Sequence, residues 1–95
     1  MFIIYSKEFF AGITGILYPN PATKNITYRI NELDAKVSEM TIEMIDGLNR
    51  KCMESKARNS NTMSLSVEHL KPGMYFYLVR IEGVVIDRGK LIIGR

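Results

Sequence analysis

Residues 74–93 read MYFYLVRIEGVVIDRGKLII, two apolar runs separated by Glu82-Gly83. Nearly every position of 74–81 is apolar, which is typical of a strand in the middle of a sheet with both faces covered. Glutamate followed by glycine favours a tight turn, because glycine accepts the positive φ that such turns require. Residues 84–93 are therefore expected to return as the closing strand, antiparallel to the first.

Shorter runs upstream alternate between apolar and polar residues, the period-two pattern of half-buried strands. They cover residues 25–30, 40–46 and 63–67, and a strand at 50–56 would complete a hairpin that turns at Asp46-Gly47. In the first run, Ile26, Tyr28 and Ile30 share one face. A seventh strand is expected either within residues 9–17 or near residues 35–37. The sequence predicts an all-β fold, an immunoglobulin-like antiparallel β-sandwich of about seven strands with Greek-key connections.

Composition places the chain among single globular domains with a thin core: it has 95 residues, 46% hydrophobic and 24% charged. The 13 basic and 10 acidic residues are interspersed without a block, so the net charge of +3 does not predict a nucleic-acid partner. No apolar run approaches the roughly 20 residues that a membrane-spanning helix needs. The first apolar run has no basic region before it and does not resemble a secretion signal. If the domain works outside the cytoplasm, its export signal is expected on a larger precursor.

Few residues in the sequence could support catalysis or bind a metal ion. His69 is the only histidine and Cys52 the only cysteine, so the four ligands of a structural zinc site are lacking and no internal disulfide can form. Cys52 is expected to be a small buried residue and His69 an exposed one before a turn. Loop carboxylates leave a calcium site open, although no Asp-x-Asp-x-Asp series marks one. We expect no enzyme, no cofactor and no small-molecule substrate.

Three consecutive aromatic residues, Tyr75, Phe76 and Tyr77, lie in the predicted central strand. They are expected to provide core packing and one exposed ring. The alternative is an exposed platform that stacks sugars or bases. Such a platform would favour an immunoglobulin-like or fibronectin-like accessory module that binds glycan, or that spaces the domains of a surface enzyme.

Four segments, in this order, resemble the type IX secretion C-terminal sorting domain, also called the Por secretion system sorting domain. They are Leu17-Tyr18-Pro19-Asn20-Pro21-Ala22, the strand and turn from Ile42 to Arg50, Leu70-Lys71-Pro72-Gly73-Met74-Tyr75-Phe76, and the terminal Lys90-Leu91-Ile92-Ile93. Together they span residues 17–95. The family's turn usually reads Asp-x-x-Gly-Arg, whereas Asn49 stands in place of that glycine here and Gly47 precedes it.

These motifs also have local structural reasons. Tyr18-Pro19-Asn20-Pro21 is expected to be a stiff, extended lead into the first strand, because proline disfavours helix in the residue before it. Asp46 is expected to cap its turn with its side chain beside Gly47, while Asn49 adopts a left-handed conformation. Pro72-Gly73 is expected to form a type II turn, since proline fixes φ and glycine accepts a positive one.

The resemblance implies a non-catalytic sorting domain at the end of a larger cargo protein. The cargo would enter the periplasm through a separate signal, and the outer-membrane translocon would recognise the folded domain and deliver it to the cell surface or the medium. A surface sortase would cut before Tyr18, leaving residues 1–16 as a linker or cargo remnant and 17–95 as the domain. The recognised surface would comprise Gly73, Tyr75, Lys90, Leu91, Ile92 and Ile93. An exposed sheet edge would allow recognition by backbone pairing, or dimerisation.

Overall fold

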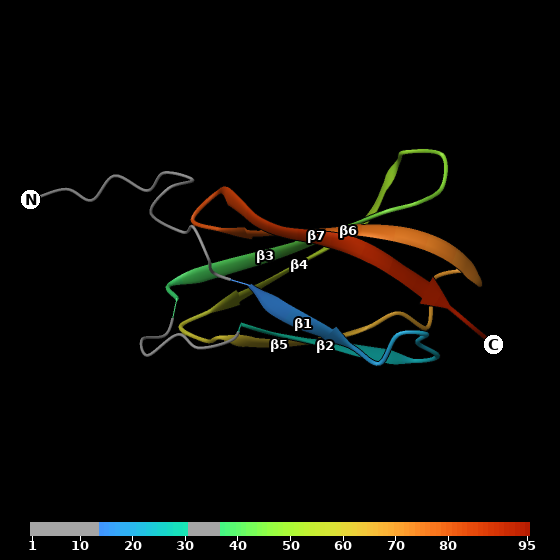
Figure 1. Ribbon diagram of the computed structural model, residues 1–95, viewed down its shortest axis with the longest axis horizontal. Coiled ribbons are helices and arrows are strands. Elements are labelled where there is room, and N and C mark those ends of the chain that lie inside the picture. Colours follow the sequence, from blue (N-terminus) through green and yellow to red (C-terminus); the bar gives the residue numbers. More distant parts are fainter. Residues whose placement is uncertain (1–13, 31–36) are drawn as a thin grey trace, which may run out of the picture.

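A computed structural model of the chain describes residues 14–30 and 37–95 and shows two layers of strands (Figure 1). The described residues form seven strands and no helix. In chain order the strands are β1 (Gly15–Tyr18), β2 (Asn25–Ile30), β3 (Glu39–Ile45), β4 (Lys51–Arg58), β5 (Thr62–Ser66), β6 (Gly73–Ile81) and β7 (Val84–Ile93). The bounds of β2 to β7 agree with the predicted strands to within about two residues, the usual uncertainty of strand ends.

The strands divide into a three-stranded sheet, in the order β1-β2-β5, and a four-stranded sheet, in the order β4-β3-β6-β7. All the hydrogen-bonded strand pairs of these sheets are antiparallel. The chain crosses from one sheet to the other after β2, after β4 and after β5. The predicted immunoglobulin-like β-sandwich is confirmed.

The core lies between the two sheets and follows from the alternation in the sequence. Along β2, Ile26, Tyr28 and Ile30 are buried while Asn25 and Arg29 are exposed. β3 likewise buries its inward-facing methionine and isoleucine residues, as the alternating pattern predicted. Because burying one large apolar side chain contributes about 1.5–3 kcal/mol, a slip of one residue in either strand would be costly.

β6 occupies the predicted central position, between β3 and β7, but only one of its faces is covered. Tyr75, Val79 and Ile81 are buried against the other sheet. Met74 and Phe76 point the opposite way and are 45% and 42% exposed. The expectation that both faces would be covered is therefore wrong, because the described residues supply no third layer over this sheet. The expectation of core packing with one exposed ring in the aromatic run is confirmed.

The turn between β6 and β7 has the predicted position and chemistry. Glu82 and Gly83 have positive φ angles of 51° and 81°, and Ile81 and Val84 pair on either side of them. Positive φ at both central residues is the requirement of the type I′ turn, which matches the twist of the flanking strands.

β1 lies partly within the first of the two segments predicted to hold a seventh strand, since it begins at Gly15 and pairs with β2. Gly15 and Ile16, which the sequence assigned to a linker, thus belong to this sheet. The alternative near residues 35–37 falls mostly on residues 31–36, which lie outside the described residues, as do residues 1–13.

Candidate functional site at the carboxy-terminal strand

The residues predicted to form the recognised surface are divided between the core and the solvent. Tyr75, Leu91 and Ile93 are buried, with 7%, 0% and 2% of their surface exposed, whereas Gly73, Lys90 and Ile92 are exposed. In β7 this is simple alternation, because successive side chains point to opposite faces of the sheet. Three of the six predicted site residues therefore pack in the core, and the other three are accessible to a partner at the surface of β6 and β7.

The side-chain amide of Asn20 pairs with the outer edge of β7. Its Nδ2 donates a hydrogen bond to the carbonyl oxygen of Lys90 at 2.7 Å, and its Oδ1 accepts one from the backbone N–H of Ile92 at 3.0 Å. A carboxamide carries the same kinds of donor and acceptor as a peptide group. Asn20 thus takes the place of a backbone peptide in an additional strand beside β7.

The backbone of Ala22 continues this pairing. Its N–H donates to the carbonyl oxygen of Ile92 at 2.8 Å, and its own carbonyl accepts from the N–H of Gly94 at 2.8 Å. The loop between β1 and β2 therefore lies beside the carboxy-terminal end of β7 (Figure 1). Along this stretch the chain's own loop already occupies the backbone groups at the edge of β7.

Arg95 fastens the end of the described chain to two loops. Its guanidinium donates hydrogen bonds to the carbonyl oxygens of Thr23 at 2.9 Å, of Val67 at 2.7 Å and of Leu70. A guanidinium offers five N–H donors in a fixed plane, so one side chain can hold carbonyls from separate loops. The sequence reasoning missed Arg95, and its only local signal is a cation directly after the last strand.

The remaining residues of the opening motif flank Asn20 in the same loop. Tyr18 ends β1 and is 41% exposed, and Pro19 and Pro21 are exposed as well. The peptide bonds that precede both prolines are cis. The segment predicted to be an extended lead into the first strand is instead the loop between β1 and β2, which carries Asn20 to β7.

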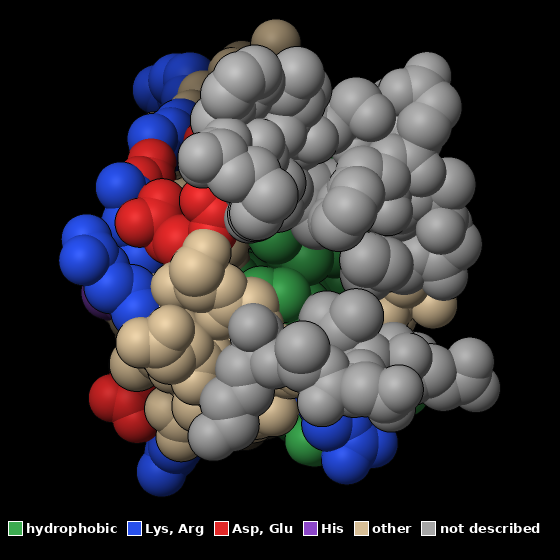
Figure 2. All heavy atoms as spheres, turned by 90° about the vertical axis from the view of Figure 1, so that its left-hand side faces the viewer, with side chains coloured by type: hydrophobic (Ala, Val, Ile, Leu, Met, Phe, Trp, Pro, Cys, Tyr) green, Lys and Arg blue, Asp and Glu red, His purple; other side chains and the backbone are tan. Residues whose placement is uncertain are grey.

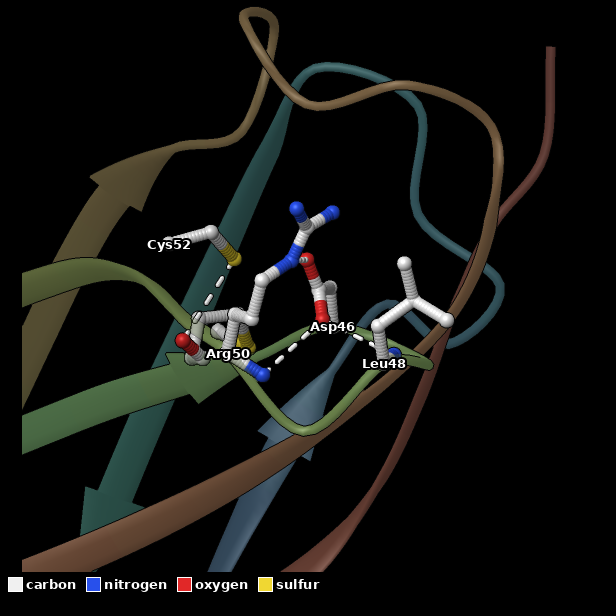
Figure 3. Close-up of polar contacts among 5 residues, drawn as sticks. Asp46, Leu48, Arg50 and Cys52 are labelled. Carbon is white, nitrogen blue, oxygen red and sulfur yellow. Dashed lines mark hydrogen bonds and ion pairs between the residues drawn. The ribbon is translucent and has the colours of Figure 1, made fainter.

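The turn between β3 and β4 is organised by the carboxylate of Asp46 (Figure 3). Asp46 Oδ1 accepts hydrogen bonds from the backbone N–H groups of Leu48 at 2.9 Å and Arg50 at 3.0 Å, and Oδ2 accepts one from Arg50 Nε at 3.1 Å. The pKa of Asp46 lies below its usual value, and the hydrogen bond from the backbone N–H of Arg50 is the main cause. Asn49 has a φ of 65°, so the predicted left-handed asparagine and the predicted side-chain cap are both confirmed. Gly47 lies at the exposed tip.

The loop before β6 differs from the predicted type II turn. Its hydrogen-bonded turn comes earlier, where the N–H of Leu70 donates to the carbonyl of Val67 at 3.0 Å. Pro72 is exposed, and Gly73 has a φ of 148°, a positive value that residues with a side chain rarely adopt. Inside the sandwich the hydroxyl of Tyr75 donates to the carbonyl of Lys71 at 2.6 Å, so a buried residue of β6 fixes this loop.

A buried tyrosine links the two sheets under β7. The hydroxyl of Tyr28 in β2 donates a hydrogen bond to Asp87 Oδ2 in β7 at 2.8 Å. Burial, followed by the contact with Asp87, raises the pKa of Tyr28 well above its usual value. Tyr28 meets the ring of Tyr77 edge to face at 6.5 Å, and Tyr77 in turn lies over Gly89, where a Cβ would be 2.4 Å from its hydroxyl. The glycine in β7 therefore leaves room for this ring.

The isolated reactive residues do not combine into a second site. Cys52 is exposed, so the prediction that it would be buried is wrong. Its thiol donates to the carbonyl of Met44 at 3.4 Å (Figure 3), and desolvation by the surrounding protein raises its pKa. His69 is exposed in its turn, as predicted. Within residues 14–30 and 37–95 no three His, Cys, Asp or Glu residues lie close enough to hold a metal ion.

The described surface carries mixed charge. At the end of the sandwich on the left of Figure 1, acidic and basic side chains adjoin one another along one flank (Figure 2). On the outer face of the four-stranded sheet, Glu43 and Arg80 form an ion pair, and Glu39 lies 3.8 Å from Arg58. No helix in the described part of the chain is long and apolar enough to cross a membrane.

Comparison with known proteins adds a family and a fold. A family model described as "Secretion system C-terminal sorting domain" matches residues 16–94. No curated protein matches the chain. Among solved structures, a polysaccharide deacetylase from Bacillus cereus is similar over 87% of this chain, with a TM-score of 0.62 and 12% sequence identity. The chain spans 30% of the length of that protein, and at this identity the similarity shows the fold alone.

Proposed function

The chain belongs to the family of secretion system C-terminal sorting domains, and we propose that it acts without catalysis, as an address that an outer-membrane translocon reads on a folded surface. The family match over residues 16–94 carries this proposal. Membership indicates a type IX secretion sorting signal, attached to a cargo protein and exported across the outer membrane to the cell surface or the medium.

The arrangement of the carboxy-terminal motif supports recognition of a folded domain. In Lys90 to Ile93 every second side chain is buried, so only Lys90 and Ile92 present theirs to a partner. The loop with Asn20 then fixes the position of this strand in the sheet. A partner that reads these side chains in this geometry needs the sandwich as well as the sequence.

We place the cut by a surface sortase on the amino-terminal side of β1. β1 pairs with β2 from Gly15 to Tyr18, so a cut inside it would remove part of an edge strand from the three-stranded sheet. A cut before Gly15 releases the cargo and leaves every described strand in one piece. The mass of the released fragment decides between these positions.

The experiment that tests the proposed function joins residues 1–95 to the carboxy terminus of a periplasmic reporter protein. The reporter should become accessible to protease added outside intact cells of a type IX-competent host, and should stay inaccessible when the translocon gene is deleted. A reporter that remains in the periplasm of the competent host would contradict the proposal. The same reporter without the domain controls for leakage.

A further inference from the structure

Five apolar side chains lie together on the outer face of the four-stranded sheet, and we call them the outer patch. They are Ile45 of β3, Met74, Phe76 and Leu78 of β6, and Ile92 of β7. Three of them are strongly exposed, with 45% of Met74, 42% of Phe76 and 37% of Ile92 accessible. Grouped exposed apolar side chains of this kind mark surfaces that contact another molecule.

The strand register places the members of the outer patch next to one another. Met74 pairs with Ile92, and Phe76 pairs with Ile45 on one side and with Lys90 on the other. Next to Phe76 is a hollow of about 400 Å³, which Met74 and Ile92 do not line. Its lining comprises Ile45, Phe76 and Leu78 of the patch, together with Tyr77, Arg88, Gly89 and Lys90. An apolar hollow with a few polar groups at its rim is the usual form of a site that receives one anchoring side chain.

The two cations at this rim are among the cations of the outer face that have no ion pair within the described part of the chain. Arg80 is paired with Glu43, and Arg58 has Glu39 at 3.8 Å. The side chains of Arg88 and Lys90 form no ion pair with any described residue. They lie two positions apart on β7 and on the same face, about 7 Å from each other. Lys56 on the outer face of β4 has no ion pair among the described residues either, but it does not line the hollow. The rim is therefore where unpaired cations lie beside an apolar hollow, an arrangement that fits a partner's carboxylate next to an apolar side chain.

We propose that the outer patch, with Arg88 and Lys90, is the surface through which the translocon holds the domain, and that its occupant is a protein segment with an apolar side chain beside an acidic one. This inference rests on the function proposed above. The apolar side chain fills the hollow, while the carboxylate pairs with Arg88 or Lys90. A fully buried aromatic or aliphatic anchor of this kind supplies most of the affinity of many interfaces.

The charges of the sheet favour a protein segment over an anionic membrane surface. Binding to a membrane surface needs cations spread over a broad face. Here three of the cations on the outer face, Lys51, Arg58 and Arg80, are in contact with Glu54, Glu39 and Glu43, which neutralise them. A narrow segment over β6 and β7 meets Arg88, Lys90 and the apolar hollow together.

Export of the reporter fusion measures the contribution of this surface. Phe76→Ser and Lys90→Glu should each lower the surface fraction about tenfold, the effect of losing about 1.4 kcal/mol of binding. Ile16→Ser removes an exposed apolar side chain from the other sheet, and Lys56→Glu reverses a charge on the outer face of β4; both should be exported like the unmodified domain. Phe76→Ser and Ile16→Ser each remove an apolar side chain that is a little under half exposed, so they should lower the urea midpoint by similar small amounts. Lys90→Glu and Lys56→Glu should leave it unchanged, since both lysines are exposed.

The outcomes separate this inference from the proposed function. Failure of the unmodified fusion to reach the surface contradicts the function itself. Normal export of Phe76→Ser and Lys90→Glu overturns the surface assignment and leaves the function standing. A photo-crosslinking amino acid at position 76 should capture a translocon polypeptide through a segment that contains Asp or Glu, and lysine at that acidic position should restore export of Lys90→Glu. Crosslinks to lipid, to a second copy of the domain or to nothing overturn the inference.

Discussion

Asn20 and Lys90 are 70 residues apart in the sequence and are joined by a hydrogen bond of 2.7 Å from the side-chain amide to the backbone carbonyl. The bond connects the opening motif of the domain to its terminal strand. Edge strands with unpaired backbone groups invite pairing with other chains, and native proteins commonly cover them. In this domain the cover is a loop that uses the side chain of Asn20 and the backbone of Ala22.

Replacing Asn20 should therefore destabilise the domain through its last strand. Asn20→Ala removes two hydrogen bonds from the edge of β7 and should lower the free energy of unfolding by about 1–2 kcal/mol. Asn20→Asp should cost at least as much, because a carboxylate cannot donate to the carbonyl of Lys90. Asn25→Ala, at an exposed position of β2, is the control and should change the free energy of unfolding by less than about 0.5 kcal/mol. Urea denaturation gives these values, and faster hydrogen exchange at the Ile92 amide should accompany only the Asn20 variants.

Asp46 makes part of the stability depend on pH. Its pKa in the folded domain lies below its usual value of 3.8, so the carboxylate stabilises the turn fully above pH 3.8 and loses this effect as the pH falls below it. The side chain in Asp46→Asn keeps an oxygen that can accept hydrogen bonds from the N–H groups of Leu48 and Arg50. Unlike the carboxylate, it does not titrate. The drop in urea midpoint between pH 7 and pH 3 should be smaller for the variant, and equal drops would contradict this role.

Any side chain at position 89 should destabilise the domain. A Cβ at this position would lie 2.4 Å from the hydroxyl oxygen of Tyr77, so Gly89→Ala should destabilise the domain by about 1–3 kcal/mol. Gly47 is the matched control, because a Cβ there would meet nothing within 4 Å. Gly47→Ala should change the free energy of unfolding by no more than about 0.5 kcal/mol. Similar values for the two variants in urea denaturation would show that Tyr77 does not occupy this space.

Arg95 should stabilise the domain more than a typical surface arginine. Arg95→Ala removes hydrogen bonds to three backbone carbonyls and should lower the free energy of unfolding by about 1–3 kcal/mol. Arg58→Ala provides the comparison, since that side chain is 77% exposed and its contact with Glu39 measures 3.8 Å. It should change stability by less than about 0.5 kcal/mol. Equal losses of stability for Arg95→Ala and Arg58→Ala in thermal or urea denaturation would contradict the stabilising role of Arg95.

Local patterns in the sequence were sufficient to predict most of the fold. The alternation in β2 predicted which side chains are buried, because the period of a strand is fixed by its geometry. The cap by Asp46 and the left-handed Asn49 were predictable for the same reason, since both depend on residues within one turn. The Glu82-Gly83 turn is a third local case.

The remaining features depend on residues far apart in the chain. Nothing near Asn20 shows that its amide will meet Lys90, and nothing near Arg95 names the carbonyls that it binds. The apolar run of β6 had two explanations, a second covering layer or an exposed patch, and periodicity cannot distinguish them. The exposure of Phe76 shows that the second explanation holds among the described residues.

The central claim is that the folded domain is an address independent of its cargo. It is tested most directly by moving residues 1–95 onto two unrelated periplasmic reporters and measuring the fraction of each that external protease digests on intact cells. We predict that both reporters reach the surface when the type IX translocon is present and that neither does when it is deleted. Periplasmic retention of both reporters in the competent host, or surface arrival without the translocon, would contradict the account.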